Sequence, residues 1–501
     1  MAMQTALRLN PADNVAVALH ALSRGDDAVG VRICDDIPTA HKFALTAIPS
    51  GATVIKYGFP IGVASTNIPA GAHVHTHNLR NALDDVFSGS GAAHAESRPA
   101  ESEISNLRFD GFHRPDGRVG VRNEIWIINT VACVNQAAQQ IATSAARELP
   151  LSKFGVDGVY TFAHPFGCSQ LGDDLQRTQN VLASLVRHPN AAAVLVLGLG
   201  CENNRLASFL EKLGPLDRNR VKYFNAQEVG DEIDEGIKAV GELAEYASTF
   251  RRIPTPASEL IIGAKCGGSD GFSGITANPL VGLVADRLTD SGATVLLSEV
   301  PEMFGAERLL LGRAADAETS TSIVKLVNEF RDYFRRHNQP IDENPAPGNK
   351  DGGITTLAEK SLGCVQKGGR AAIRHVVPYA SPAPSRAGGV ALVNAPGNDG
   401  VSGTALTIAG ANLILFTTGR GTPMGFPAPT IKISTNSELA TRKPRWIDFD
   451  AGRILDDSAS ADSLANELLE LVLSVASGKT QTRTEQNGCR EIAIWKDGVT
   501  V

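Results

Sequence analysis

Long hydrophobic runs and an excess of basic charge are both missing from this 501-residue chain. The longest apolar run, around residues 191–200, falls well short of the roughly 20 residues that a membrane-spanning helix needs. The first residues lack the basic start and apolar stretch of a secretory signal. The 47 lysines and arginines against 54 acidic residues give a net charge of −7, which argues against a nucleic-acid binder. We therefore expect a cytoplasmic protein without a membrane segment or a nucleic-acid partner.

Cysteine is scarce as well, with seven residues in the whole chain. So small and odd a number excludes a disulfide framework, and each cysteine is expected to be a thiol in a reducing compartment. We expect Cys34, Cys133, Cys364 and Cys489 to be buried as small apolar residues.

The length predicts several domains, because 501 residues at roughly 100–200 per domain correspond to two to four. Residues 1–83 hold short β-type runs separated by turn signals, which predict a small β domain. Residues 84–106 are rich in Gly, Ser, Ala and acidic residues and have no apolar period. We interpret them as a linker.

The rest of the chain alternates apolar β-type runs with amphipathic stretches. The alternation fills residues 107–252 and resumes in residues 253–501 after a proline-containing break. It is typical of parallel α/β sheets, in which ligands bind beyond the carboxyl ends of the strands. Many of the 49 glycines follow apolar runs, where such loops lie. We therefore expect two α/β domains here.

The densest polar cluster is the segment GAHVHTHN at residues 71–78. Three of the eleven histidines, His73, His75 and His77, lie within it. On an extended strand these side chains point to the same face, because the strand period is two. Adjacent imidazoles favour a divalent-metal site, although a His-rich strand end without a ligand is the alternative. His41, Lys56 and Tyr57 occur in the same predicted domain and could face the same pocket.

Three cysteines occupy similar positions in the α/β region. Cys168, Cys201 and Cys266 each follow an apolar β-type run, so they are expected at the carboxyl edge of a sheet. There they could act as soft ligands of iron or of an iron–sulfur cluster, or line a pocket. The absence of a close CxxC spacing does not favour the cluster.

Glycine-rich loops in the same region have the features of anion sites. The segment GGSDGFSG at residues 267–274 contains Ser269 and Asp270 and offers backbone N–H groups to a carboxylate. The segment TTGRGTP at residues 417–423 adds the guanidinium of Arg420. The segment RVGVRN, with Arg122, is a weaker example. None has the pattern of a phosphate-binding P-loop or a dinucleotide fingerprint, which favours a small polyhydroxylated acid over a nucleotide.

Longer segments identify a family. The segment HKFALTAIPSGATVIKYGFPIGVA, followed by AGAHVHTHN, resembles the SAF-type (β-clip) domain of the altronate/galactarate dehydratase family. The segments HPFGCSQLGDD, GLGCENN, CGGSDGFSGITANP and FTTGRGTPMGFPAPTIKISTNSELA resemble the main domains, in family order. The resemblance runs from about residue 13 to the C-terminus, and the linker is its weakest stretch.

The resemblance implies both a fold class and a reaction. The fold class is an α/β multidomain protein, in which a small N-terminal β-clip (SAF-type) domain joins two α/β domains with largely parallel sheets. The reaction is the loss of water from D-altronate to give 2-dehydro-3-deoxy-D-gluconate, by a lyase that uses Fe²⁺, with Mn²⁺ as a substitute. Galactarate or another aldonate or aldarate is the alternative substrate.

Such a reaction assigns roles to the polar residues. A base removes the proton from C2, an acid protonates the departing C3 hydroxyl, and a divalent metal stabilises the developing charge. We place the metal at His73 and His75, with His41 as a third ligand or the base, and Lys56 and Tyr57 as acid–base or carboxylate contacts. The residues expected to hold the carboxylate and hydroxyls are Arg122, Ser269, Asp270, Asn278, Arg420 and Thr422.

Two further hypotheses belong to other classes of protein. In the first, Cys168, Cys201 and Cys266 bind an iron–sulfur cluster with an open iron, as in a cluster-dependent hydro-lyase. In the second, the chain is a sugar-acid binding protein without catalysis. The expected partner in every case is a small sugar acid, with a homodimer left open. Because the histidines and the anion loops fall in different predicted domains, we expect the substrate in a cleft between them.

Overall fold

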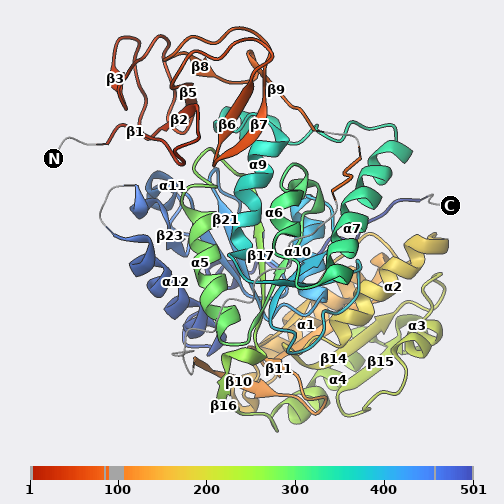
Figure 1. The fold of residues 1–501 in the computed structure, drawn as a ribbon. Helices are drawn as coiled ribbons and strands as arrows, with labels where there is room; N and C mark the ends of the chain where they lie inside the picture. The colour runs from red at the N-terminus through yellow and green to blue at the C-terminus, as the bar shows by residue number, and fades with distance from the viewer. Residues whose placement is uncertain (1–3, 84–85, 90–106, 456–458, 499–501) are drawn as a thin grey trace.

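The computed structural model describes residues 4–83, 86–89, 107–455 and 459–498. Its three parts follow one another along the chain, with the N-terminal domain packed on one end of the last (Figure 1). Apart from residues 86–89, the linker expected at 84–106 lies outside the described residues.

The N-terminal domain consists of short antiparallel strands. One sheet has the order β1-β2-β5-β8, with β1 at Ala6–Leu7, β2 at Val15–Ala18, β5 at Lys42–Ala44 and β8 at His73–Val74. A second sheet has the order β6-β7-β9, with β6 at Thr53–Lys56, β7 at Phe59–Ala64 and β9 at Leu79–Arg80. The strands β3 (Asp27–Ala28) and β4 (Val31–Arg32) form a hairpin. This is the small β domain that the turn signals predict.

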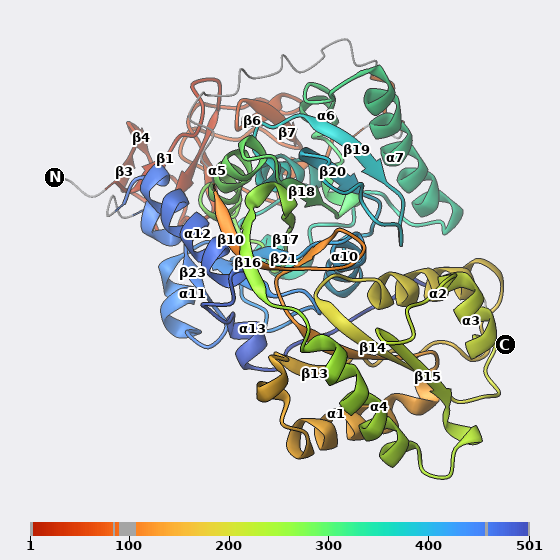
Figure 2. The ribbon, with the colours of Figure 1, turned by 90° about the horizontal axis from the view of Figure 1, so that it is seen from below.

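The second domain is a parallel sheet covered by helices on both faces. Its order is β13-β12-β14-β15, with β12 at Glu124–Asn129, β13 at Gly158–Thr161, β14 at Ala191–Gly198 and β15 at Val221–Asn225. The helices α1 (Asn135–Glu148) and α4 (Glu232–Ala247) cover one face, and α2 (Gly172–Val186) and α3 (Leu206–Leu213) cover the other (Figure 2). β14 is buried along its whole length, as expected for a strand with two covered faces.

The third domain is built on a larger sheet of seven parallel strands, in the order β19-β20-β18-β17-β21-β22-β23. The strands are β17 (Ile261–Cys266), β18 (Thr294–Leu297), β19 (Ile373–Val377), β20 (Gly389–Val393), β21 (Leu413–Thr418), β22 (Thr430–Ser434) and β23 (Phe449–Asp450). The helices α5 (Ala277–Asp290), α7 (Ala317–Arg336) and α12 (Ala461–Ala476) pack on one face, and α10 (Asp399–Ile408) packs on the other. Two parallel α/β sheets preceded by a β domain confirm the expected fold class.

Shorter elements complete the body. The antiparallel strands β10 (Arg108–His113), β11 (Val119–Gly120) and β16 (Arg252–Pro256) connect the second and third domains. The remaining α-helices are α6 (Glu307–Leu311), α8 (Pro347–Asp351), α9 (Leu357–Cys364), α11 (Ser437–Arg442) and α13 (Arg483–Gln486). Among the described residues, no helix is both long and apolar enough to cross a membrane.

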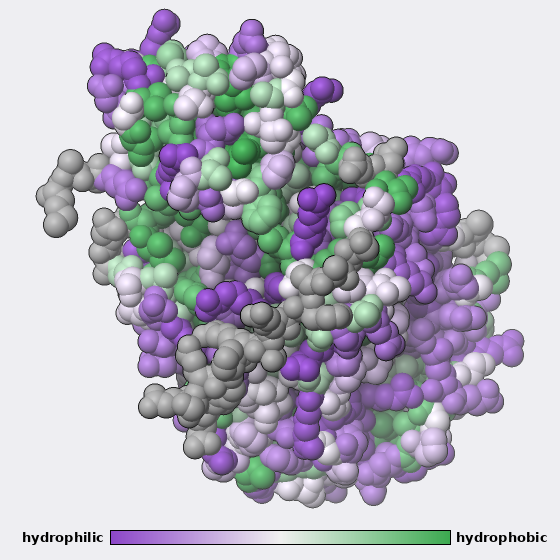
Figure 3. All heavy atoms as spheres, viewed as in Figure 1, coloured by the Kyte–Doolittle hydropathy of each residue, from purple (hydrophilic) through white to green (hydrophobic). Residues whose placement is uncertain are grey.

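The N-terminal domain shares its core with the third domain. Val54 and Ile61 of the small domain belong to the same buried apolar cluster as Leu357 and Leu362 of α9. At the other end of the contact, a Cβ on Gly271 would lie 2.0 Å from the carbonyl oxygen of Ala40, so only glycine allows this approach. Hydrophobic and neutral residues are visible near this junction in Figure 3. The small domain is therefore fixed against the third domain by a continuous core.

Candidate active site

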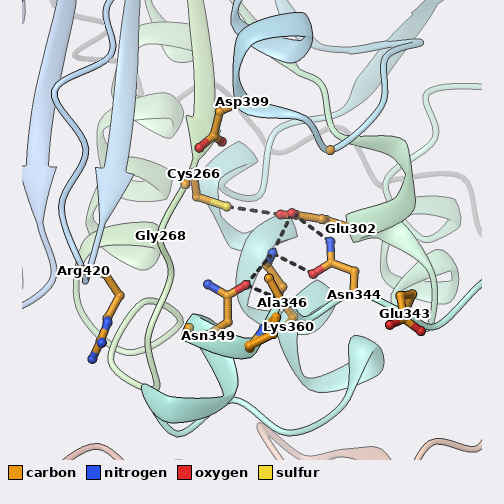
Figure 4. Close-up of a pocket in the computed structure, with 14 residues that line it drawn as sticks. Cys266, Gly268, Glu302, Glu343, Asn344, Ala346, Asn349, Lys360, Asp399 and Arg420 are labelled. Atoms are coloured by element: carbon orange, nitrogen blue, oxygen red, sulfur yellow. Dashed lines mark hydrogen bonds and ion pairs between the residues drawn. The ribbon is translucent and has the colours of Figure 1, made fainter.

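A cavity of about 610 Å³ opens at the carboxyl edge of the third-domain sheet (Figure 4). Parallel strands bring their following loops to this one edge. Cys266 ends β17, Arg420 follows β21, Asp399 begins α10, and Lys360 comes from α9. The other polar side chains that line the cavity are Glu302, Glu343, Asn344 and Asn349.

A buried ion pair forms one wall of the cavity. Lys360 Nζ lies 2.8 Å from Glu302 Oε1 and 2.9 Å from Asn344 Oδ1. Burial alone would raise the pKa of Glu302, but the charges of Lys360 and Lys367 outweigh it and hold the pKa at about 2. Burial likewise lowers the pKa of Lys360, yet the charge of Glu302 raises it above the ordinary value. Both groups are therefore charged at neutral pH.

Two thiols stand next to this pair. Cys266 Sγ and Cys364 Sγ are 3.3 Å apart and lie 3.3 Å and 3.1 Å from Glu302 Oε2. Lys367 Nζ is 3.0 Å from Cys266 Sγ and 3.1 Å from Glu299 Oε2. Cys266, Glu302 and Cys364 are also a group of potential metal ligands whose donor atoms all lie within 4.8 Å of one another. The charges of Lys360 and Lys367 already balance the acidic groups in this wall.

The opposite side of the cavity carries Asp399 and Arg420. Asp399 Oδ1 lies 2.6 Å from the buried Nζ of Lys265, while about a third of the Asp399 side chain is exposed. The backbone N–H of Arg420 donates to the carbonyl oxygen of Gly268. Its guanidinium forms no hydrogen bond or ion pair with the other residues that the structure describes. Arg420 also lines a neighbouring cavity of about 420 Å³, which contacts Ala40 of the N-terminal domain and Asp351 of the third domain.

Four histidines of the N-terminal domain lie close together where that domain contacts the third domain. The ring centroids of His41, His73 and His75 are separated by 5.0–5.3 Å, and His77 lies 5.5 Å from His73. His41 Nδ1 is 3.0 Å from His73 Nε2. Burial is the main cause that lowers the pKa values of these imidazoles, to about 3 for His73 and about 4 for His75. They are neutral at physiological pH, which is the form that binds a metal.

The histidines are oriented by the third domain. His41 Nε2 lies 3.1 Å from the carbonyl oxygen of Asp351, and His75 Nε2 lies 2.9 Å from that of Lys350. A ring nitrogen that faces a carbonyl must carry the proton, so Nδ1 of each ring keeps its lone pair. Lys350 and Asp351 end α8, whose Asn349 lines the larger cavity. One short helix therefore contacts both the histidines and the cavity.

Lys56 and Tyr57, predicted as acid–base or carboxylate contacts, do not line the larger cavity. Lys56 is fully buried and pairs at 2.8 Å with Glu359 of α9, which also pairs with Lys42 at 2.8 Å. The hydroxyl of Tyr57 packs close to Gly274 and Gly363. Both side chains lie in the contact between the small domain and the third domain.

Of the residues expected to bind substrate, some lie at the larger cavity and others do not. Arg420 lines the cavity, and Ser269 follows its wall residue Gly268, with a buried hydroxyl that has no recorded partner among the described residues. Asp270 is occupied by Thr435, Ser273 and Asn436, and Asn278 by Thr417. Arg122 forms an ion pair at 2.7 Å with Glu485, and Thr422 Oγ1 accepts a hydrogen bond from the backbone of Met424. None of these four residues lines the larger cavity, but Asp270 lines the neighbouring cavity together with Arg420.

The structure places Cys266 in a different domain from the other two cysteines considered as cluster ligands. Cys168 and Cys201 are exposed in the second domain, whereas Cys266 is buried in the third domain beside Cys364. The expectation that Cys34 and Cys133 are buried is wrong, since both are exposed, and Cys489 is half-buried. Cys364 is buried, but its neighbours are charged rather than apolar.

Sequence reasoning missed most of the polar cavity wall: Glu302, Glu343, Asn344, Asn349, Lys360 and Asp399. One available signal was the segment LAEKSLGC, which forms α9 and is buried on every side although it contains Glu359 and Lys360. Charged residues in an otherwise apolar short helix indicate buried partners. A second signal was Glu302, shortly after an apolar strand, at the sheet edge where ligands bind.

Comparisons with known proteins agree with this architecture. The family description "Altronate/galactarate dehydratase SAF domain" matches residues 4–82, "D-galactarate dehydratase/Altronate hydrolase, second domain" matches residues 111–248, and "D-galactarate/Altronate dehydratase, C-terminal" matches residues 257–500. A curated altronate dehydratase from Escherichia coli is 48% identical, over 99% of both chains. The chain belongs to the altronate/galactarate dehydratase family.

Two further relatives show the range of this family. An altronate dehydratase from Bacillus subtilis is 45% identical over 100% of both chains. A galactarate dehydratase (L-threo-forming) from E. coli is 32% identical, over 96% of this chain and 94% of its own. The chain is therefore more similar to these two altronate dehydratases than to this galactarate dehydratase.

Proposed function

We propose that this chain is a hydro-lyase that removes water from D-altronate to form 2-dehydro-3-deoxy-D-gluconate, with the cavity between β17, α9 and α10 as its substrate site. The observation that carries the proposal is the cavity wall, which combines a free guanidinium with two ion pairs, Glu302–Lys360 and Asp399–Lys265. Such a wall provides a carboxylate contact together with groups that can move a proton. Identities of 48% and 45% with altronate dehydratases favour altronate over galactarate.

Substrate binding is assigned to three polar side chains that line the cavity, Arg420, Asn344 and Asn349. The guanidinium of Arg420 binds the C1 carboxylate in a bidentate manner, because its planar fork matches two carboxylate oxygens. The amides of Asn344 and Asn349 contact the hydroxyl groups, for which a donor and an acceptor on one side chain are suited. Asn349 Nδ2 already donates to the carbonyl oxygen of Ser269, which fixes the orientation of its amide.

Proton transfer is assigned to Asp399 and Lys360. Glu302 is a poor base, because its two oxygens accept bonds from Lys360, Asn344 and both thiols. Asp399 is more accessible, and its recorded ion pair engages a single oxygen. Asp399 removes the proton from C2, and Lys360, which Glu302 holds as an ammonium, donates a proton to the departing C3 hydroxyl. The enol that remains takes a proton at C3 and becomes the 2-keto acid.

His41 and His73 offer two ring nitrogens at a spacing that suits a divalent metal, and the ring of His75 lies beside both. Two nitrogen ligands at bonds of about 2.0–2.1 Å and nearly at right angles lie roughly 3 Å apart, and His41 Nδ1 and His73 Nε2 are 3.0 Å apart. The carbonyl contacts of His41 and His75 resemble the outer hydrogen bonds that usually orient metal-bound imidazoles. None of these rings lines the larger cavity, so a bound Fe²⁺ would supply its positive charge at the domain contact beside α8. The cysteine–glutamate group fits a metal less well, since its charge is already balanced by lysines.

The test is a keto-acid assay of the full chain after anaerobic incubation with Fe²⁺. D-Altronate, galactarate and several other aldonates are compared at equal concentration, and the 2-keto-3-deoxy product is measured. We expect keto acid from altronate at a kcat/KM at least tenfold above that for galactarate. Preference for galactarate would reassign the substrate. Binding of altronate without any loss of substrate would contradict the proposed activity.

A further inference from the structure

A pair of buried thiols in the cavity wall has no role in the proposed chemistry. Cys266 ends β17 and Cys364 ends α9, and their sulfur atoms are 3.3 Å apart. Both residues are buried, but Cys266 also lines the cavity, so small molecules that enter the cavity reach its sulfur. In the part of the chain that the structure describes, this is the one pair of cysteine sulfurs in hydrogen-bond contact.

The two thiols stand in different electrostatic settings. Lys367 Nζ is 3.0 Å from Cys266 Sγ and donates a hydrogen bond to it. Burial lowers the pKa of Lys367, but Cys266 and Glu299 raise it well above its usual value, so the ammonium persists. Cys364 lies behind Cys266 and does not line the cavity. Cys266 is therefore the thiol that meets a molecule in the cavity first, and Cys364 is its partner.

We infer that Cys266 and Cys364 form a reversible oxidation site, in which hydrogen peroxide that enters the cavity converts the two thiols into a disulfide. The Cys266 sulfur gives up its proton and attacks one peroxide oxygen, the O–O bond breaks, and the departing hydroxide takes up a proton as water, which leaves a sulfenic acid on Cys266. The sulfur of Cys364 then attacks the Cys266 sulfur and expels a second water. Two thiols are oxidised and one peroxide is reduced to two waters.

The geometry requires little movement for the second step. The sulfur atoms need to approach by little more than 1 Å to reach a disulfide bond of about 2.0 Å, from their present separation of 3.3 Å. The nearby carboxylate of Glu302 lies 3.1 Å from Cys364 Sγ and can take the proton that this thiol releases. Glu302 also holds Lys360, so a disulfide removes two donors from the carboxylate that positions the proposed acid. Loss of turnover on oxidation rests on the proposed function.

The experiment treats the full chain with hydrogen peroxide, blocks the remaining thiols by alkylation, and digests it without reduction. We expect a cross-linked peptide that joins Cys266 to Cys364 and weighs two hydrogen atoms less than the sum of the separate peptides. Altronate turnover should fall at least tenfold in parallel and return after dithiothreitol. The variant Cys34→Ser, which removes an exposed thiol, should form the same cross-link.

The variant Cys364→Ser tests whether the two thiols react as a pair or independently. Without its partner, Cys266 should accumulate as the sulfenic acid, which a 1,3-diketone probe labels, and prolonged exposure to excess peroxide should oxidise it further to forms that dithiothreitol does not reduce. Full recovery of Cys364→Ser by dithiothreitol after that prolonged exposure would overturn the inference. Absence of the cross-link in the unmodified chain when its exposed thiols are oxidised would also overturn it. The cross-link is detected by mass spectrometry, so the oxidation site is tested independently of altronate turnover.

Discussion

Lys360 Nζ lies 2.8 Å from Glu302 Oε1, and this buried pair joins α9 to the loop after β18 at the wall of the third-domain cavity. Glu302 keeps Lys360 protonated, and Lys360 in turn keeps Glu302 ionised. The pair therefore places an ammonium at the cavity without an excess of local charge. In the proposed reaction this ammonium faces the hydroxyl group that leaves.

Replacement of the proposed base should abolish most of the turnover. Asp399→Asn keeps the size of the side chain but cannot accept the C2 proton, so kcat should fall by a factor of about 10²–10⁴. Circular dichroism and thermal melting confirm that the variant folds. Glu343→Gln, at the exposed edge of the same cavity, is the matched control and should retain activity within about twofold. Equal losses in both variants would remove Asp399 from its role.

Arg420 should govern substrate affinity rather than the chemical step. Arg420→Gln removes a bidentate contact with the C1 carboxylate, worth about 1.5–3 kcal/mol, so KM should rise roughly 10- to 100-fold with a smaller change in kcat. Arg445→Gln, another exposed arginine, should leave KM unchanged. An unchanged KM for Arg420→Gln would place the carboxylate elsewhere.

Glu359 should be critical for attachment of the N-terminal domain. Glu359→Gln leaves Lys42 and Lys56 buried without their counter-charge, and should lower the free energy of unfolding at pH 7 by about 3–5 kcal/mol. Glu438→Gln removes an exposed ion pair with Arg442 and should cost less than about 1 kcal/mol. Urea titrations followed by fluorescence measure both.

The effect of Glu359 should also depend on pH. Burial would raise the pKa of Glu359, but Lys42 and Lys56 lower it to about 2, from an ordinary value of 4.5. A carboxylate with a lowered pKa in the folded state stabilises the protein above its unfolded pKa and loses that contribution as the pH falls. The difference in stability between the unmodified chain and Glu359→Gln should therefore shrink as the pH falls from 4.5 towards 2. A difference that grows in acid would contradict the ion pair.

The histidine group should determine metal content. His73→Ala should reduce bound Fe²⁺ at least tenfold after anaerobic loading and desalting, because it removes a ligand from the center of the group. His77→Ala, which alters the neighbouring ring, should retain the metal. Glu302→Gln tests the other group of potential ligands, Cys266, Glu302 and Cys364. If this variant loses iron while His73→Ala retains it, the metal is bound by that group instead of by the histidines.

The sequence was most informative where a feature is local. Turn signals and the alternation of apolar residues predicted the β domain and the two parallel α/β domains. His73 and His75 do lie side by side, but β8 ends at Val74 and His75 belongs to the turn that follows, so the strand period is not the reason. Arg420 could be predicted because a strand followed by a Gly-rich loop places its side chain at the carboxyl edge of a sheet.

Contacts between distant segments could not be derived in the same way. Lys56 and Glu359 are 303 positions apart, and the lysine alone does not show whether its partner is a substrate or a protein carboxylate. Arg122 resembled an anion-binding arginine, but its ligand is Glu485. No local sequence pattern identifies Cys364 as the neighbour of Cys266. The two sulfurs meet because the end of α9 lies against the end of β17.

Turnover of D-altronate in D₂O tests the central claim most directly. If the cavity residues remove the C2 proton and water departs from C3, the enol must take one proton from solvent, since C3 becomes a methylene group. We predict that each molecule of 2-dehydro-3-deoxy-D-gluconate carries one deuterium at C3, as read by NMR and mass spectrometry. A product that contains no solvent deuterium at C3, or altronate that remains unchanged in the presence of Fe²⁺, would contradict the account.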